Sequence, residues 1–358
     1  MCLFLWYNHI VMNMPLFLKN LLIITSIFVV GVSPVLADVD TDFFPDATSV
    51  YSSVVADSEA VVLQSEEVVA PEVSLVDEPI IRVGLYKTSE AITFKSEFSY
   101  AVWSGGVLRG VVSPGEIVQL SYKKGGYLLK SPNLEFGSTD YFRLVPEDAA
   151  HYFSLTNYTR LVAGRNKINF NVYRGTLEYR YSPKSKLPYI INELPLDLYV
   201  KGIAETHDDA PTEYIKALSV AARSYAYALI SKKPPTEKRM FDVYATTMDQ
   251  LYLGYNSELY MPKFVAAALA TSGELVTYNN NPVITFYFSR SSGSTKSGGK
   301  DRPWLKSVVA TYDKGKKMLG HGIGMSNSDA QQRAAKDDWT YQQILEYYYS
   351  GTSVQKIF

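Results

Sequence analysis

The sequence has 358 residues with 35 basic and 36 acidic side chains, a formal net charge of −1 at pH 7. Its single cysteine, Cys2, lies in a segment that we expect to be removed, which excludes thiol catalysis, disulfides and cysteine-ligated metal from the mature chain. The near-neutral charge hides an asymmetry. Residues 38–78 hold eleven acids and no Lys or Arg, whereas residues 79–358 carry nine more basic than acidic side chains.

The first 37 residues have the features of an export signal. Leu21–Val32 is an unbroken apolar run after Lys19, and the small residues that end at Ala37 suit a cleavage site. We predict a signal peptide over residues 1–37, with an uncleaved N-terminal anchor as the alternative. Either reading places the rest of the chain outside the cytoplasm, secreted or associated with the cell wall, with membrane contact only through this segment.

Residues 38–78 are acidic, rich in Ser, Val and Ala, and without a clear period, so we predict a flexible spacer. The basic body that follows suits a polyanionic surface such as a cell wall. Nucleic acid would suit the charge equally, but export removes it as the expected partner.

Residues 79–181 are predicted to form a β-rich module. Short alternating runs such as Ile81–Leu85 and Ile117–Leu120 are separated by turn signals such as Gly105-Gly106 and Pro114-Gly115. Residues 182–358 contain helices instead. The clearest helix spans Thr212–Ser231, where apolar residues recur at spacings of three and four after Pro211.

Further elements are expected in this second part of the chain. We predict helices at Met261–Ser272, Ser328–Lys336 and Tyr341–Tyr349, and strands at Glu274–Tyr278 and Val283–Phe288. The fold class is therefore mixed α/β (α+β), with the β-rich module packed beside a helix-containing core.

An ordered set of motifs carries a family resemblance. The motifs are Leu194–Glu205, Tyr214–Tyr225, Phe241-Asp242, Asp249–Gly254, Thr271–Tyr278, Phe288–Thr295, Gly320–Ser326 and Tyr348–Thr352. Taken together, these segments resemble the stage II sporulation protein D (SpoIID) family, which includes the LytB-type amidase enhancers.

The resemblance implies a peptidoglycan lytic transglycosylase that cleaves between N-acetylmuramic acid and N-acetylglucosamine. The family's catalytic glutamate falls on Glu205, which would act first as acid and then as base. Ordinary glycosidases need two carboxylates, whereas here the C6 hydroxyl of the muramic acid attacks and gives a 1,6-anhydro product. The structural alternative for Glu205 is a carboxylate near a helix start, with a lowered pKa.

The expected partner is the glycan strand, and the functional alternative is a non-catalytic glycan-binding enhancer of a cell-wall amidase. Hydroxyls, amides and aromatic faces recognise sugars, which points to a set of candidate binding residues. They are Tyr287, Ser289, Ser291, Ser292, His321 and Gln250. The competing interpretations are a solvent-exposed polar loop for the serines and a structural histidine for His321.

No cofactor and no metal are predicted. Some family members place Cys and His ligands in the segment equivalent to Phe241–Gln250, where this chain has Tyr244, Met248 and Asp249. Lys216 and Arg223 lie seven residues apart on the long helix, and an internal ion pair is preferred over substrate binding for them. The sequence leaves open the biological process, the oligomeric state and whether stem peptides must first be removed.

Overall fold

The computed structural model describes residues 75–165, 167–232 and 240–358. The predicted signal segment and all but the last residues of the predicted spacer lie outside this part of the chain. Within the described residues, no helix combines the length and apolar character needed to cross a membrane. They belong to one compact unit, Val69–Phe358.

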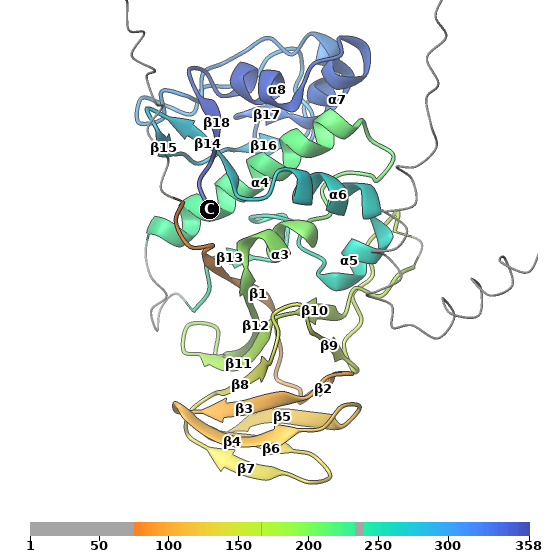
Figure 1. Cartoon of the computed structure of the whole chain (residues 1–358), viewed down its shortest axis with the longest axis vertical. Coiled ribbons are helices and arrows are strands. Elements are labelled where there is room, and N and C mark those ends of the chain that lie inside the picture. The colour runs from red at the N-terminus through yellow and green to blue at the C-terminus, as the bar shows by residue number, and fades with distance from the viewer. Residues whose placement is uncertain (1–74, 166, 233–239) are drawn as a thin grey trace, which may run out of the picture. The chain divides into compact units, whose positions relative to one another are not determined.

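Strands dominate the first half of this unit (Figure 1). They are β1 (Ile80–Lys87), β2 (Ile92–Lys95), β3 (Tyr100–Ser104), β4 (Val107–Val112), β5 (Ile117–Lys123), β6 (Gly126–Lys130), β7 (Glu135–Ser138), β8 (Phe142–Pro146), β9 (Tyr152–Leu155), β10 (Val172–Arg174), β11 (Thr176–Ser182) and β12 (Leu187–Pro195).

Helices and short strands follow. They are α3 (Leu196–Lys201), α4 (Thr212–Lys232), β13 (Val243–Tyr244), α5 (Tyr255–Tyr260), α6 (Pro262–Ala270), β14 (Glu274–Tyr278), β15 (Asn281–Pro282), β16 (Tyr287–Phe288), η1 (Thr311–Asp313), β17 (Met325–Ser326), α7 (Asn327–Lys336), α8 (Tyr341–Tyr348) and β18 (Ser353–Lys356).

Two sheets organise the β-rich part. One has the order β13-β1-β12-β11-β8-β3-β4 and the other has the order β10-β9-β2-β5-β6-β7. In β1, the alternate residues Ile81, Val83 and Leu85 are buried, as expected for a strand with one face on the core. Glu178 of β11 is also buried, and it is held by Arg82 of β1 and by Arg143 of the neighbouring strand β8.

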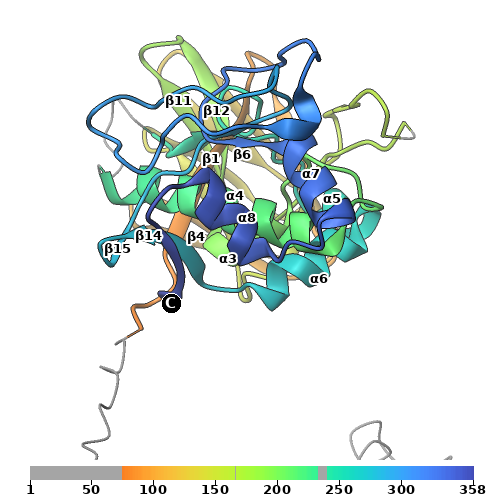
Figure 2. The ribbon, with the colours of Figure 1, turned by 90° about the horizontal axis from the view of Figure 1, so that it is seen from above.

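Helix α4 lies at the centre of the helical part. It contacts α3, α6, α7, α8 and β14, and Figure 2 shows α7 and α8 lying across it. Small residues such as Ala217, Ala221 and Ala222 are fully buried, so neighbouring elements can approach its backbone closely. An amphipathic stripe alone would not explain this helix, because it is covered on several sides.

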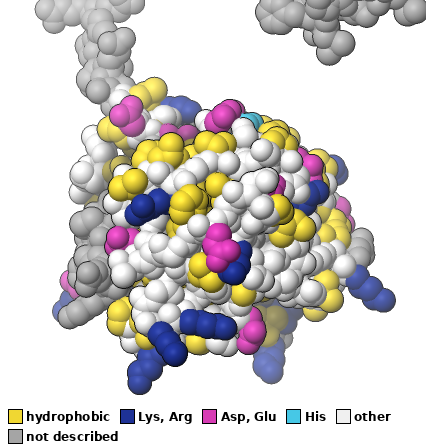
Figure 3. Space-filling model, turned by 90° about the horizontal axis from the view of Figure 1, so that it is seen from below, with side chains coloured by type: hydrophobic (Ala, Val, Ile, Leu, Met, Phe, Trp, Pro, Cys, Tyr) yellow, Lys and Arg dark blue, Asp and Glu magenta, His cyan; other side chains and the backbone are white. Residues whose placement is uncertain are grey.

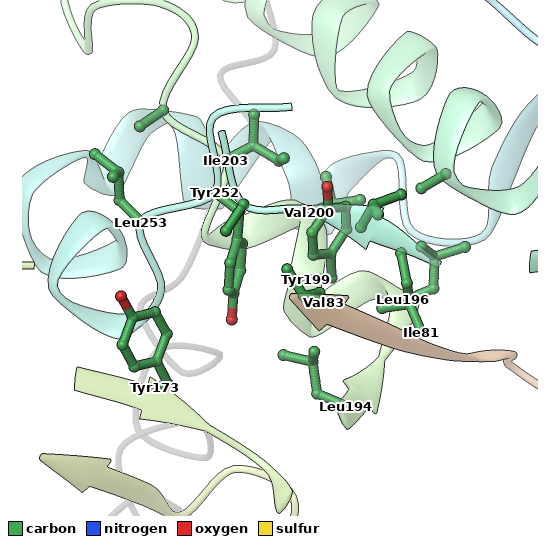
Figure 4. Packing of buried hydrophobic residues seen from close by; sticks show 14 of the residues in the cluster. Ile81, Val83, Tyr173, Leu194, Leu196, Tyr199, Val200, Ile203, Tyr252 and Leu253 are labelled. Carbon is green, nitrogen blue, oxygen red and sulfur yellow. The ribbon is translucent and has the colours of Figure 1, made fainter. Parts of the chain in front are cut away.

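Helix α3 joins the seven-stranded sheet to the helical part. Figure 4 shows its residues Leu196, Tyr199 and Val200 packing with Ile81 and Val83 of β1. The rings of Tyr199 and Tyr252 are stacked with centroids 4.9 Å apart. This packing fixes the segment that follows α3, which carries Glu205.

The end of the molecule that bears β3–β7 has a mixed surface. Figure 3 shows that end, where hydrophobic side chains are interspersed with Lys, Arg and a few acidic residues. The exposed apolar residues of β4 and β5 are Val107, Leu108, Val111 and Ile117.

The predicted fold class is confirmed, and the elements agree in detail at several positions. The four predicted helices correspond to α4, α6, α7 and α8, with bounds that differ by no more than two residues. The strand predicted at Val283–Phe288 is formed only at its end, by β16; residues 283–285 are buried and Phe286 is half-buried, and all four lie outside the strands. The predicted domain boundary after residue 181 falls within β11, which pairs with both β8 and β12.

The interpretation of Lys216 and Arg223 as members of ion pairs is confirmed. Arg223 is fully buried, binds Asp197 of α3 with Nε at 2.6 Å from Oδ1, and donates to the carbonyl of Ala268 in α6 at 2.9 Å. Lys216 instead pairs with Glu213 at 2.7 Å near the surface of the same helix.

These two pairs predict very different costs of substitution. Arg223→Met should lower the free energy of unfolding by about 3–5 kcal/mol, because it removes the cation that pairs with Asp197 and the donor to the buried carbonyl of Ala268. Lys216→Met on the same helix should cost about 0–1 kcal/mol, because its pair is accessible to water. Urea denaturation of both variants measures the difference, and similar losses would contradict the assigned role of Arg223.

Candidate active site

A cleft of about 860 Å³ opens between the helical part and the loops that follow β13 and β16. Its walls come from five short segments, from Tyr214 and Tyr225 of α4, and from one side of α7 that presents Asn327, Ser328, Gln331 and Gln332. The five segments are residues 162–165, 204–207, 247–251, 286–289 and 319–321. The cleft therefore gathers five of the residues that the sequence singled out: Glu205, Gln250, Tyr287, Ser289 and His321.

Glu205 is placed by a short bridge between two segments far apart in sequence. Ile203 pairs with Tyr252, the amide of Ala204 donates to Leu251 O at 2.9 Å, and the amide of Leu253 donates to Gly202 O at 2.8 Å. Gly202 is required at this crossing, because a Cβ there would lie 2.4 Å from the ring of Tyr252. The chain thus delivers Glu205 to the cleft immediately after the bridge.

The side chain of Glu205 is partly buried and accepts two hydrogen bonds. The amide of Leu251 donates to Oε1 at 3.1 Å, and the hydroxyl of Tyr287 donates to Oε2. Burial raises the pKa of Glu205 above its usual range, and the hydrogen bonds from Tyr287 and Leu251 oppose that rise only in part. This direction matches a general acid and is opposite to that of a carboxylate stabilised by a helix dipole.

Gln250 and Tyr287 lie behind the carboxyl. The Gln250 side chain is fully buried; its Nε2 donates to the Tyr287 hydroxyl at 2.8 Å, and its Oε1 accepts from Tyr199 at 2.9 Å. Burial holds the pKa of Tyr287 well above its usual range, so the hydroxyl keeps its proton. The polar atoms of both predicted sugar-binding residues are therefore engaged with protein groups.

The hydroxyl run after β16 divides into separate environments. Ser289 is exposed and lines the cleft. Ser291 is buried, and its hydroxyl donates to Asp313 Oδ2 at 3.1 Å. Ser292 is exposed and does not line the cleft. Ser291 thus has the contacts of a residue that anchors the loop, and Ser289 is the serine of this run that substrate can reach.

His321 lies at the cleft beside the rings of Phe286 and Phe288, with centroids 5.9 and 5.5 Å away. Its Nδ1 accepts from the amide of Ile323 at 3.0 Å, which fixes the imidazole within the turn. Desolvation lowers its pKa, which favours the neutral ring at neutral pH. A neutral imidazole can hydrogen-bond a sugar without adding charge near Glu205.

Asp249 and Arg165 also line the cleft, and the sequence did not identify either as a site residue. Asp249 accepts from the Tyr225 hydroxyl at 2.9 Å and from the amide of Tyr244 at 2.8 Å. Arg165, which is 7% exposed, donates to Ala204 O and Thr206 O, both at 2.7 Å, and so holds the backbone on each side of Glu205. The position of Asp249 next to Gln250 was a usable signal, whereas Arg165 lies in a loop without a motif.

No group of three or more His, Cys, Asp or Glu side chains placed to hold a metal ion occurs within the described residues. Asp208 accepts from the amide of Phe264 in the first turn of α6 at 3.0 Å. That contact ties the loop after Glu205 to α6.

The fold and the cleft define a mixed α+β protein in which one partly buried glutamate with a raised pKa faces a large cleft. Comparison with known proteins gives a family match for part of the chain. Residues 185–278 match the family model described as SpoIID, Stage II sporulation protein. The resemblance drawn from the motifs is confirmed, and this stretch, which holds Glu205 and Gln250, is a SpoIID-family region.

Individual relatives agree with this assignment. The chain is 29% identical over 140 residues to Stage II sporulation protein D of Bacillus subtilis (strain 168), a match that covers 35% of this chain and 41% of the relative. The corresponding protein of Bacillus amyloliquefaciens is 29% identical over 143 residues, with the same coverage. An uncharacterized protein of Brachyspira hyodysenteriae is 33% identical over 127 residues, covering 35% of this chain and 33% of the relative. The chain thus spans about two fifths of the length of the two Bacillus relatives it matches.

The wall that holds Tyr287 depends on a glycine. Gly324 has φ +78°, and a Cβ there would lie 1.9 Å from Phe286 O, where β16 pairs with β17. Gly315 has almost the same φ, +79°, but a Cβ there would meet nothing within 4 Å. An alanine would therefore have the same backbone strain at both positions, but only at Gly324 would its Cβ also clash with a neighbouring atom.

We expect Gly315→Ala to cost about 1–2 kcal/mol from backbone strain alone and Gly324→Ala to cost clearly more. Urea denaturation measures the two free energies of unfolding, and NMR of ring-labelled tyrosine should show Tyr287 displaced only in Gly324→Ala. Equal costs would contradict the tight crossing at Phe286.

Proposed function

We propose that this protein is an exported peptidoglycan lytic transglycosylase in which Glu205 is the acid and then the base. The observation that carries the proposal is the carboxyl of Glu205, held at the wall of a cleft of about 860 Å³ with its pKa raised by burial. A glutamate of raised pKa can be protonated when substrate binds, which is the state that a general acid needs. The match of residues 185–278 to the SpoIID family model supports the same assignment.

The proposed reaction requires no water. Glu205 gives its proton to the bridging oxygen as the bond from that oxygen to C1 of the N-acetylmuramic acid breaks. The C6 hydroxyl of the same sugar then forms the new bond to C1, and its proton passes to Glu205, which returns to its starting state. Asp249 also faces the cleft, but its oxygens are bound to Tyr225 and Tyr244, as suits a carboxylate with a structural role.

The alternative function is a glycan-binding enhancer of a cell-wall amidase, which would not cut. One observation favours it: both carboxyl oxygens of Glu205 accept hydrogen bonds from the protein. A purely structural glutamate would have the same contacts. In both functions the ligand is the glycan strand, and the basic excess over residues 79–358 suits a location at the polyanionic wall outside the cytoplasm.

Glu205→Gln separates the two functions. The amide keeps the size of the side chain but cannot deliver and retrieve a proton, so we expect glycan binding and thermal stability to survive while cleavage falls by about a hundred- to ten-thousand-fold. Mass spectrometry of the products should show 1,6-anhydro ends from the wild type. Continued release of anhydro products by the variant would exclude Glu205 as the catalyst. A wild type that cuts no glycan but accelerates a co-incubated amidase would establish the enhancer function.

A second test concerns metal. The proposed reaction passes only protons between Glu205 and the sugar, so treatment with a chelator should leave the rate of cleavage unchanged. The measurement is the release of anhydro-muropeptides before and after EDTA, with and without added zinc. A large loss of activity that zinc restores would show that the site includes a metal ion.

A further inference from the structure

A chain of hydrogen bonds runs from α3 through the core to Glu205. The Tyr199 hydroxyl donates to Gln250 Oε1 at 2.9 Å, Gln250 Nε2 donates to the Tyr287 hydroxyl at 2.8 Å, and the Tyr287 hydroxyl donates to Glu205 Oε2. Tyr199 and Gln250 are almost fully removed from water, with exposed fractions of 0% each. Tyr199 and Gln250 therefore belong to the core, whereas Tyr287 is half-buried and reaches the wall of the cleft.

The direction of every donor in this chain is fixed. The carbonyl of Ala222 in α4, which can only accept, lies 3.2 Å from Gln250 Nε2, so the nitrogen of the amide faces Ala222 and Tyr287. An amide nitrogen donates and does not accept. The oxygen of Tyr287 must therefore accept from Gln250, and its single proton is left for Glu205.

We propose that Tyr287 is a positioning residue for Glu205, and that Gln250 and Tyr199 orient its hydroxyl for that purpose. This inference rests on the proposed function, in which Glu205 is the acid. It gives Tyr287 and Gln250 a different role from sugar binding. The neutral Tyr287 hydroxyl holds Oε2 of Glu205 in place. Oε1 can then bind the substrate in place of the amide of Leu251.

Other ionisable groups line the same cleft from several elements, and three of them bind partners other than Glu205. Arg165 binds two backbone carbonyls, Asp249 binds Tyr225, and the Nδ1 of His321 accepts from Ile323. His207 lines the cleft, and Tyr214 presents its ring from α4. Among the residues that the structure describes, Tyr287 is the one side chain recorded as hydrogen-bonded to the carboxyl of Glu205.

The sign of the effect on Glu205 follows from the donor. A donated hydrogen bond stabilises the ionised carboxylate and lowers its pKa, against the rise caused by burial. Removing the Tyr287 hydroxyl should therefore raise the pKa of Glu205 further. Because the acid must be protonated before cleavage, activity should then persist to higher pH, although at a lower maximum.

The test is Tyr287→Phe, which keeps the ring and removes the hydroxyl. We expect the alkaline limb of the kcat/KM profile to move by about one pH unit to higher pH and kcat to fall roughly tenfold to a hundredfold through loss of orientation. The matched control is Tyr347→Phe, which removes a hydroxyl bound to the carbonyl of Val309 outside the cleft. The control should leave the pH profile unchanged.

A direct titration distinguishes failure of this inference from failure of the proposed function. Carbon-13 NMR of labelled glutamate carboxyls, with Glu205 assigned through Glu205→Gln, follows its pKa whether or not the protein cuts glycan. A higher pKa in Tyr287→Phe supports the inference even if the wild type proves inactive. Tyr199 lies at the end of the hydrogen-bond chain farthest from Glu205, so Tyr199→Phe should raise the pKa of Glu205 by a smaller amount. This variant serves as the test if Tyr287→Phe does not fold. An unchanged titration of Glu205 in the folded variants would overturn the inference.

Discussion

The bridge between Ile203 and Tyr252 is the constraint on which the site depends. It holds the segment after α3 against the segment after β13, so that the amide of Leu251 meets the carboxyl of Glu205. Gly202 permits this approach because any side chain there would strike the Tyr252 ring. The bridge is therefore needed both to bury Glu205 and to bring its carboxyl to the Tyr287 hydroxyl, which Gln250 orients.

The chemistry of the site is a balance between withdrawal from water and hydrogen bonding. Burial alone favours the neutral acid, whereas donors favour the carboxylate. The donors to Glu205 are an amide and a tyrosine, both neutral. A lysine or arginine in their place would stabilise the negative charge far more strongly and hold the group ionised. Neutral donors therefore fix the geometry of the carboxyl while leaving its proton available for transfer.

The sequence predicted those features that depend on local patterns. The periodic apolar residues located α4 to within one residue of its end, and the family motifs identified Glu205 and four further residues that line the cleft. The sequence did not predict which residues that are distant in sequence contact one another in the fold. Leu251 and Tyr287 lie 46 and 82 residues from Glu205. Ser291 looks like an exposed hydroxyl in sequence, yet its partner Asp313, 22 residues further on, buries it.

Helix α4 links stability to chemistry through two consecutive residues. Arg223 binds Asp197 and thereby fixes α3, which leads to the bridge and to Glu205. Ala222 offers its carbonyl to Gln250 and thereby sets the direction of the hydrogen-bond chain that ends on the same carboxyl. Carbonyl groups in a helix point along its axis while side chains point outward, so adjacent residues can serve two different neighbours. A shift of α4 along its axis would disturb both the Arg223–Asp197 ion pair and the contact between Ala222 and Gln250. The elements packed around α4 oppose such a shift.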